Sequence, residues 1–296
     1  MNNVILNILM NIKKKYKMKQ LNSYYKTNSC YLNNFLIDKS KNTLIMTVSF
    51  NNETVIKKQI ELIEKFCKDS YVYIVADNST DINKRKNIKE ICINRNILYY
   101  PLPINNPFNN YDPSSSHGAA LNYLWKNIVD KISHIDYIMI LDHDIFPTNY
   151  FSVEEMLNNQ PFYGLVKERK LGWYLWPGFC CYKKESCIGK VINFLPSEYG
   201  DTGSSNYLSL YQNFDLYKVN KATFECVDLD INKVECSDKY IDQKNRIEII
   251  DTKWIHLINA ADWAGVGNVN KKFEKMMNFI NNNLKEININ ENNCDL

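Results

Sequence analysis

The residues best suited to chemistry are two aspartates that follow a run of apolar residues. Asp142 and Asp144, separated by His143, come directly after residues 137–141 (YIMIL). The apolar run predicts a buried strand, and side chains at i and i+2 of an extended chain share a face. Carboxylate oxygens suit Mg²⁺ or Mn²⁺, which proteins commonly share with substrate phosphates. The spacing therefore predicts a divalent-metal site at the two aspartates, with His143 pointing away from it.

A cation at this place would reverse the electrostatics of the site. Two like charges about 4 Å apart repel by about 4 kcal/mol at an effective dielectric of 20, so bare carboxylates would reject a diphosphate. A divalent cation attracts a diphosphate and stabilises the charge that grows on it as it departs. A solvated acidic turn is the alternative, because two aspartates at this spacing also occur by chance.

The elements before the two aspartates alternate between apolar, β-branched runs and segments of helical periodicity. Strands are expected at 43–50, 71–76, 97–100 and 137–141, and helices at 56–67, at 83–94 and from about His117 onward. Strands separated by helices indicate a largely parallel sheet covered on both faces. In such open sheets ligands bind outside the carboxyl ends of the strands, which is where the two aspartates would lie.

The second half of the chain is less regular. Short strands are expected at 163–167, 178–182 and 247–256. Apolar residues at helical spacing between Phe273 and Leu284 predict a final helix. An α/β first half completed by a mixed second half is the predicted fold class.

Three motifs follow the expected strands in order and together suggest a family. They are residues 46–52 (MTVSFNN), residues 75–81 (VADNSTD) and Asp142-His143-Asp144. Over about residues 43–150 this set resembles the GT-A class of nucleotide-sugar glycosyltransferases, closest to glycosyltransferase family 2. The resemblance implies a Rossmann-like, mostly parallel central sheet flanked by helices, with a mixed acceptor-side half.

The same resemblance implies an activity and its partners. We expect a metal-dependent transferase that uses Mn²⁺ or Mg²⁺ and takes a sugar from a nucleoside-diphosphate sugar, with a UDP-sugar favoured. The acceptor would be a hydroxyl of a glycan, lipid or protein, and inversion of the anomeric centre is expected. No nucleic acid is expected as a partner.

The residue pattern along the chain, together with the resemblance, suggests how the chain is divided. Residues 1–42 would form a basic, amphipathic helical extension. Residues 43–288 would form one GT-A domain, with a nucleotide-binding half at 43–150 and an acceptor half at 151–288. Residues 289–296 would be a flexible tail.

Nucleotide-binding residues follow from the resemblance position by position. It places Ser49 and Asp77, with Asn78 nearby, against the base and ribose, and Asp142 near the diphosphate through the cation. The alternative for residues 77–79 is a cap on the next helix, a common use of Asp, Asn and Ser.

The resemblance places a helix start at His117 and Gly118 near the phosphates. Free backbone N–H groups at such an end favour an anion, and glycine permits close approach. The arginine that family 2 usually carries in this region is missing, so His117 either substitutes for it or caps the helix.

A third metal ligand is expected from the second half. His256 ends a strand-like run and resembles the late histidine that closes metal sites in several GT-A enzymes, although a lone histidine is more often structural. His134 and His143 fit less well, because His134 precedes the strand and His143 would point away from the aspartates.

An inverting reaction needs a carboxylate near the acceptor hydroxyl. We choose Asp201, which lies between glycines on a loop, over Glu198 and Asp262, since functional residues concentrate on loops. An ordinary turn aspartate is the alternative.

Trp176 and Gly178 offer an aromatic face and close approach for a sugar or acceptor. Tryptophans more often fill cores, which is the alternative here.

The same motifs argue against two rival classes of enzyme. A haloacid-dehalogenase-type phosphatase also has two aspartates after a strand, but it requires Thr or Val where this chain has Phe146, and it places them on its first strand. A nucleotidyltransferase usually carries a Gly-rich basic loop where this chain has Asn51-Asn52-Glu53. A nucleotide-sugar binding module or a catalytically inactive scaffold protein stays open.

Composition and charge exclude other classes. The 296 residues are 45% hydrophobic and 23% charged, which excludes a wholly disordered chain, and a net charge of +3 does not indicate nucleic-acid binding. The nine cysteines are odd in number and show no C-x-x-C spacing, so we expect reduced thiols and a cytoplasmic location.

The N-terminal segment raises the question of membrane contact. Its apolar run at residues 4–12 is short and precedes five lysines between Lys13 and Lys19, the reverse of the order in a signal peptide. The segment is either a weak anchor on an anionic membrane surface or a helix packed on the body of the protein.

Overall fold

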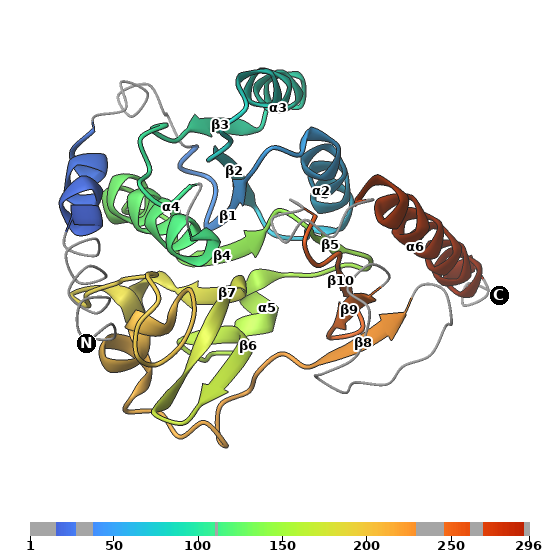
Figure 1. Ribbon diagram of the computed structural model, residues 1–296. Coiled ribbons are helices and arrows are strands. Elements are labelled where there is room, and N and C mark those ends of the chain that lie inside the picture. Colours follow the sequence, from blue (N-terminus) through green and yellow to red (C-terminus); the bar gives the residue numbers. More distant parts are fainter. Residues whose placement is uncertain (1–15, 28–37, 110–111, 229–245, 261–268, 293–296) are drawn as a thin grey trace, which may run out of the picture.

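A six-stranded, mostly parallel sheet forms the centre of the protein (Figure 1). The computed structural model describes residues 16–27, 38–109, 112–228, 246–260 and 269–292. The strand order is β3-β2-β1-β4-β7-β6, in which the first four strands are parallel to one another and β7 is antiparallel to both of its neighbours, β4 and β6. The strands are β1 (Thr43–Ser49), β2 (Tyr71–Asp77), β3 (Leu98–Pro101), β4 (Tyr137–Asp142), β6 (Phe162–Arg169) and β7 (Gly172–Lys183). The predicted α/β fold class, with a mostly parallel sheet flanked by helices, is confirmed.

Helices cover both faces of this sheet (Figure 1). α4 (Pro113–Asn127) and the helical residues 16–26 pack on one face, and α2 (Glu53–Phe66) and α3 (Ile82–Asn94) pack on the other. Alternate residues of β1 divide between the two cores: Leu44 and Met46 face α4, whereas Ile45 faces α2. Strands buried on both sides explain the continuous apolar runs in the sequence.

Polar residues set the starts of the three helices. Asn52, Asp81 and Asp112 are the N-caps of α2, α3 and α4, and each accepts a hydrogen bond from a backbone N–H of the first turn. The cap at Asp112, together with Pro113 in the first helical position, starts α4 four residues before His117, where the sequence predicted it. Gly118 therefore lies inside the helix, whereas the sequence predicted that it lies at the helix start.

A second, four-stranded antiparallel sheet lies beside the first (Figure 1). Its order is β5-β10-β9-β8, and its strands are β5 (Ile145–Pro147), β8 (Phe224–Asp228), β9 (Arg246–Ile250) and β10 (Trp254–His256). The single strand predicted at 247–256 is wrong. Asp251 and Thr252 have φ values of 50° and 57°, and this left-handed pair turns the chain into the β9–β10 hairpin.

The remaining helices join the same cores. α5 (Val153–Leu157) and α6 (Val269–Asn292) both pack into the cluster under α2, α6 through Met276 and Ile280. α6 continues past residue 288, where the tail was expected to begin, and residues 293–296 lie outside the described part of the chain.

The N-terminal helical residues pack on the body of the protein. Leu21 and Tyr24 are buried, and the Tyr123 hydroxyl donates to the carbonyl oxygen of Thr27 (2.6 Å). Residues 1–15 and 28–37 lie outside the described residues, so membrane-surface contact and a cytoplasmic location stay predictions. Within the part that is described, none of the helices is both long enough and apolar enough to span a bilayer.

Gly118 allows α4 to contact a neighbouring loop. A Cβ atom at this position would lie 2.4 Å from the carbonyl oxygen of Phe194. We predict that Gly118→Ala lowers the free energy of unfolding by about 1–3 kcal/mol, because the backbone must shift. In an uncrowded helix the same change would raise stability by about 1 kcal/mol. Urea unfolding measures the difference, and a stabilised variant would contradict this packing.

Candidate active site

A cavity of about 350 Å³ opens at the carboxyl ends of β1 and β4. The first turn of α4, the turn after β4, the loop at residues 201–202 and the chain after β10 also line it. Seven of the predicted site residues border the cavity: Asn78, His117, Asp142, Asp144, Trp176, Asp201 and His256. The other four, Ser49, Asp77, Gly118 and Gly178, do not.

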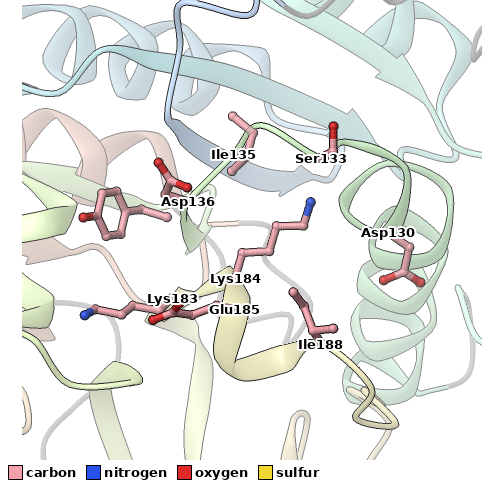
Figure 2. A pocket seen from close by; sticks show the side chains of 9 residues that line it. Asp130, Ser133, Ile135, Asp136, Lys183, Lys184, Glu185 and Ile188 are labelled. Atoms are coloured by element: carbon pink, nitrogen blue, oxygen red, sulfur yellow. The ribbon is translucent and has the colours of Figure 1, made fainter.

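A larger cavity, of about 470 Å³, lies at the opposite end of β4. Tyr137 and Lys183, which are paired in the sheet, both line it, and Figure 2 shows side chains of both charges around it, including Asp136 and Lys184. Open parallel sheets bind ligands at the carboxyl ends of their strands, and this cavity lies at the amino end of β4. The smaller cavity is therefore the candidate active site.

The turn that carries the two aspartates is held from below by a buried amide. β4 ends at Asp142, and the Gln59 Nε2 atom donates to the carbonyl oxygens of Asp142 (2.8 Å) and Ile145 (2.7 Å). The Tyr73 hydroxyl donates to Gln59 Oε1 (2.7 Å), so every hydrogen-bonding atom of this fully buried amide is used. Gln59 thus positions the turn, a role that the sequence analysis missed.

The turn also changes the expected place of His143. Because the chain bends after Asp142 and does not stay extended, His143 lines the same cavity as the two aspartates, which corrects the expectation that it points away. Its Nδ1 atom lies 3.2 Å from the carbonyl oxygen of Val48. A carbonyl only accepts, so Nδ1 carries the proton in this hydrogen bond. The Nε2 atom is buried without a hydrogen-bond partner among the described residues.

The two aspartates differ in their surroundings. Burial raises the pKa of Asp142; His117 opposes this increase, and the charge of Asp144 adds to it. His117 Nε2 lies 3.4 Å from Asp142 Oδ1, without hydrogen-bond geometry. Since α4 starts four residues earlier, His117 faces Asp142 and does not cap the helix.

Asp144 is held more tightly than Asp142. Its Oδ2 atom accepts from the backbone N–H of Ala260 (3.1 Å), and its Oδ1 atom lies 3.6 Å from His256 Nε2. Burial would raise the pKa of Asp144, but His256, His143 and the Ala260 N–H outweigh it and lower the pKa. Asp144 is therefore the carboxylate more easily kept ionised.

His256 lies between Asp144 and a carboxylate that the sequence analysis missed. Its Nδ1 atom is 2.8 Å from Glu248 Oε2. Burial would lower the pKa of His256, but Asp144 and Glu248 raise it. Burial alone would raise the pKa of Glu248, yet its hydrogen bond to His256 and the surrounding positive charges lower it to about 2.

The donor set suits a divalent cation that is shared with a ligand. Among the described residues, no three His, Cys, Asp or Glu side chains are placed to hold a metal ion by themselves. Mg²⁺ is usually held by one or two carboxylates together with substrate phosphates. Asp142 and Asp144 border the cavity with His256 beside them, which fits that arrangement.

Asp201 is an exposed residue that borders the cavity from a loop whose next residue, Thr202, is buried. Its backbone N–H donates to the Tyr174 hydroxyl (2.9 Å), and its Oδ1 atom accepts from the Thr202 N–H (2.7 Å). The Thr202 hydroxyl donates to the carbonyl oxygen of Ser114 (3.0 Å), which ties the loop to the start of α4. The side chain that we chose as the base is thus anchored at the cavity.

Trp176 and Gly178 lie close together. The Trp176 ring lines the cavity and packs on the His256 ring, with 5.1 Å between the centroids. A Cβ atom at Gly178 would lie 2.2 Å from the Trp176 ring. Gly178 therefore makes room for the tryptophan, and its approach to a sugar stays a prediction.

Ser49 and Asp77 are fully buried and hydrogen-bonded within the protein. Asp77 Oδ1 accepts from the Ser79 N–H (2.9 Å) and the Ser49 hydroxyl (3.3 Å), and Asp77 Oδ2 accepts from the Tyr99 hydroxyl (2.9 Å). Ser49 and Asp77 therefore do not border the cavity, and their contact with a base or ribose stays a prediction. The alternative that Asp77 caps the next helix is wrong, since Asp81 caps α3.

Asn78 is the member of this group that borders the cavity. Its Nδ2 atom donates to Asn109 Oδ1 and to the Ser116 hydroxyl, both at 3.0 Å. Gly118, by contrast, faces the Phe194 backbone, and Ser114 and Ser116 line the cavity in its place, so its contact with a phosphate stays a prediction.

Comparisons with known proteins give low similarity. No family model and no curated protein matches the chain. Among solved structures, the chain is similar to S. aureus TarS, at 16% identity over 51% of this chain and 30% of TarS, with a TM-score of 0.35. It is similar to the mannosyltransferase PcManGT from Pyrobaculum calidifontis in complex with GDP-Man and Mn²⁺, at 12% identity over 64% of this chain and 56% of that one, with a TM-score of 0.38.

A third similar structure is glucosyl-3-phosphoglycerate synthase from Mycobacterium tuberculosis, at 16% identity over 58% of this chain and 67% of that one, with a TM-score of 0.36. The chain spans about a third to two thirds of these three proteins. Similarity at this level does not assign a function.

Unfolding measurements can test the support that Gln59 gives to the turn after β4. We predict that Gln59→Leu lowers the free energy of unfolding by about 3 kcal/mol, because the carbonyls of Asp142 and Ile145 and the Tyr73 hydroxyl lose their buried partner. Tyr73→Phe should lower it by about 1 kcal/mol. Chemical unfolding provides the measurement. Lys57→Leu, on the exposed side of α2, is the control and should stay within about 0.5 kcal/mol of the parent. An equal decrease in the free energy of unfolding for Gln59→Leu and Lys57→Leu would contradict the supporting role of Gln59.

Proposed function

We propose that the protein is a glycosyltransferase that moves a sugar from a nucleoside-diphosphate sugar to an acceptor hydroxyl. The observation that carries the proposal is the meeting of Asp142, Asp144 and His256 with Asp201 in one cavity at the carboxyl ends of parallel strands. Such a cavity contains side chains that could bind a cation together with its diphosphate. It also contains a separate carboxylate that could deprotonate an acceptor hydroxyl. A UDP-sugar is the favoured donor, and the acceptor belongs to a glycan, lipid or protein.

The diphosphate end of the donor would lie between the aspartates and the start of α4. Asp142, Asp144 and His256 would hold Mn²⁺ or Mg²⁺, which as a Lewis acid stabilises negative charge on the leaving diphosphate. Ser114 and Ser116 line the cavity at the amino end of α4, where the helix dipole and backbone N–H groups favour phosphate oxygens. His117 adds a donor beside Asp142, in place of the arginine of family 2.

The nucleoside would lie beside Asn78. The Asn78 side chain borders the cavity together with Phe50, whereas Asp77 is occupied by its neighbours. An aromatic ring and an amide can recognise a base by stacking and by hydrogen bonds. We therefore assign base or ribose contact to Asn78 and a supporting role to Ser49 and Asp77.

The acceptor would approach Asp201 beside Trp176. Asp201 would take the proton of the acceptor hydroxyl while the acceptor oxygen bonds to the anomeric carbon and the bond to the diphosphate breaks, with inversion. The Thr202 N–H holds Asp201 Oδ1, which leaves Oδ2 as the atom to receive the proton. The Trp176 ring offers an apolar face to sugar C–H groups.

Donor binding is the first test. We expect one of UDP, GDP, CMP and TDP to raise the melting temperature of the protein in the presence of Mn²⁺ and much less in its absence. Asp144→Asn should abolish this Mn²⁺-dependent shift, because it removes the charge that is most easily kept ionised. Asp215→Asn, on an exposed residue paired with Lys218, is the control and should keep it. An undiminished shift in Asp144→Asn would exclude the proposed cation site.

The base is tested separately from donor binding. Asp201→Asn should lower kcat for transfer by about 10²–10⁴-fold, because the amide cannot take the acceptor proton. The Mn²⁺-dependent nucleotide shift should persist in this variant, since Asp201 does not hold the diphosphate. Loss of donor binding would show that Asp201 has a different role. Donor binding by the parent protein without transfer or hydrolysis would favour a binding module.

A further inference from the structure

The second sheet places a row of polar side chains behind His256. In the β9–β10 pairing His256 lies opposite Glu248, and in the β8–β9 pairing Glu248 lies opposite Cys226. Directly paired residues of antiparallel strands project from the same face, so these three side chains share one face of the sheet. The row points at Asp144, whose carboxylate lies 3.6 Å from His256.

Both carboxylate oxygens of Glu248 are used within this row. Oε2 lies 2.8 Å from His256 Nδ1, and Oε1 lies 3.2 Å from Arg246 Nη2. Arg246 Nη2 also donates to Cys226 Sγ (2.8 Å), which fixes the guanidinium from the other side. The Glu248 side chain is 12% exposed, so it is a desolvated carboxylate with directed partners and not a mobile surface ion pair.

The His256 ring is restrained on its face as well as at its edge. The Trp176 ring packs on it, and Lys167 Nζ lies 5.5 Å from the centroid of the Trp176 ring and 5.3 Å from that of Phe224. Lys167 and Arg246 are thus the cations near Glu248, and Asp144 is the anion on the opposite side of the imidazole. A ring held in this way has little freedom to flip.

We propose that Glu248 is a positioning residue that holds the His256 ring with its Nε2 atom directed at Asp144 and the cavity. A carboxylate can only accept, so the hydrogen bond to Glu248 keeps the proton on Nδ1. The nitrogen that stays available to a metal is determined by the hydrogen bond of the other nitrogen. The functional consequence rests on the proposed cation site; the orientation of the ring does not.

The experiment compares two substitutions at Glu248 with one on the neighbouring strand. Glu248→Ala removes the acceptor, Glu248→Gln keeps an acceptor oxygen without the charge, and Glu225→Ala changes an exposed carboxylate of β8 as the control. Mn²⁺ alone is titrated into each full-length variant, and free Mn²⁺ is followed by electron paramagnetic resonance. Nitrogen-15 NMR of labelled histidines reports which ring nitrogen of His256 is protonated, with His256→Gln to assign the signal.

Glu248→Ala should weaken Mn²⁺ binding by about 10–100-fold, the usual effect of removing a partner of a metal-binding histidine. Glu248→Gln should lose less, and Glu225→Ala should match the parent. At a pH where the His256 ring is neutral, its Nδ1-protonated tautomer should persist in Glu248→Gln and be lost in Glu248→Ala. A purely structural ion pair would lower the melting temperature without changing either measurement at a temperature where the variant is folded.

The outcomes separate this inference from the proposed function. Unchanged Mn²⁺ affinity and unchanged Nδ1 protonation in Glu248→Ala would overturn the role of Glu248 and leave the glycosyltransferase proposal intact. If the parent protein binds no Mn²⁺ in the absence of a diphosphate ligand, the NMR result alone decides whether Glu248 orients the ring. If Glu248→Ala does not fold, parental Mn²⁺ affinity in Glu248→Gln together with a changed His256 protonation would overturn the inference.

Discussion

Two carboxylates at one turn, Asp144 buried and Asp142 partly buried, are the constraint on which the site depends. Asp142 and Asp144 repel each other, and burial disfavours their charged forms. Three imidazoles lie near these carboxylates: His117 beside Asp142, His256 beside Asp144, and His143 within the turn itself. The net effect differs between the two aspartates: the pKa of Asp142 is raised, so it is harder to ionise, and the pKa of Asp144 is lowered, so it is easier to ionise. Added positive charge at this place, such as a divalent cation, would favour ionisation of both.

The side chains that surround and support the two aspartates come from segments far apart in the chain. Gln59 of α2 supports the turn from below, His117 comes from α4, and His256 comes from β10 of the second sheet. The β5–β10 pairing joins the strand that follows the aspartates to the strand that carries His256. The site is therefore complete only when both sheets have formed.

The sequence predicted the elements better than it predicted their contacts. Apolar runs located β1, β2, β3 and β4 within a few residues, because strands buried on both faces leave a continuous hydrophobic signal. The start of α4 was missed because Asp112 and Pro113 stand in a loop rich in Pro, Asn and Ser, where several caps are possible. The β9–β10 hairpin was missed because its turn is formed by Asp251 and Thr252, and no glycine stands there to indicate positive φ values.

That missed hairpin explains why Glu248 did not appear as a candidate. In one continuous strand, eight residues would separate Glu248 from His256 by about 26 Å, at about 3.3 Å per residue. The turn brings them to 2.8 Å.

Asp77 shows the converse limit, since an aspartate at the end of β2 has the same local pattern whether it contacts a ligand or its own loop. In this structure Tyr99, Ser49 and Ser79 hydrogen-bond to its carboxylate, and the adjacent Asn78 borders the cavity. Local sequence identifies which residues can do chemistry, and the partners that tertiary packing assigns to them determine which ones are left available to a substrate.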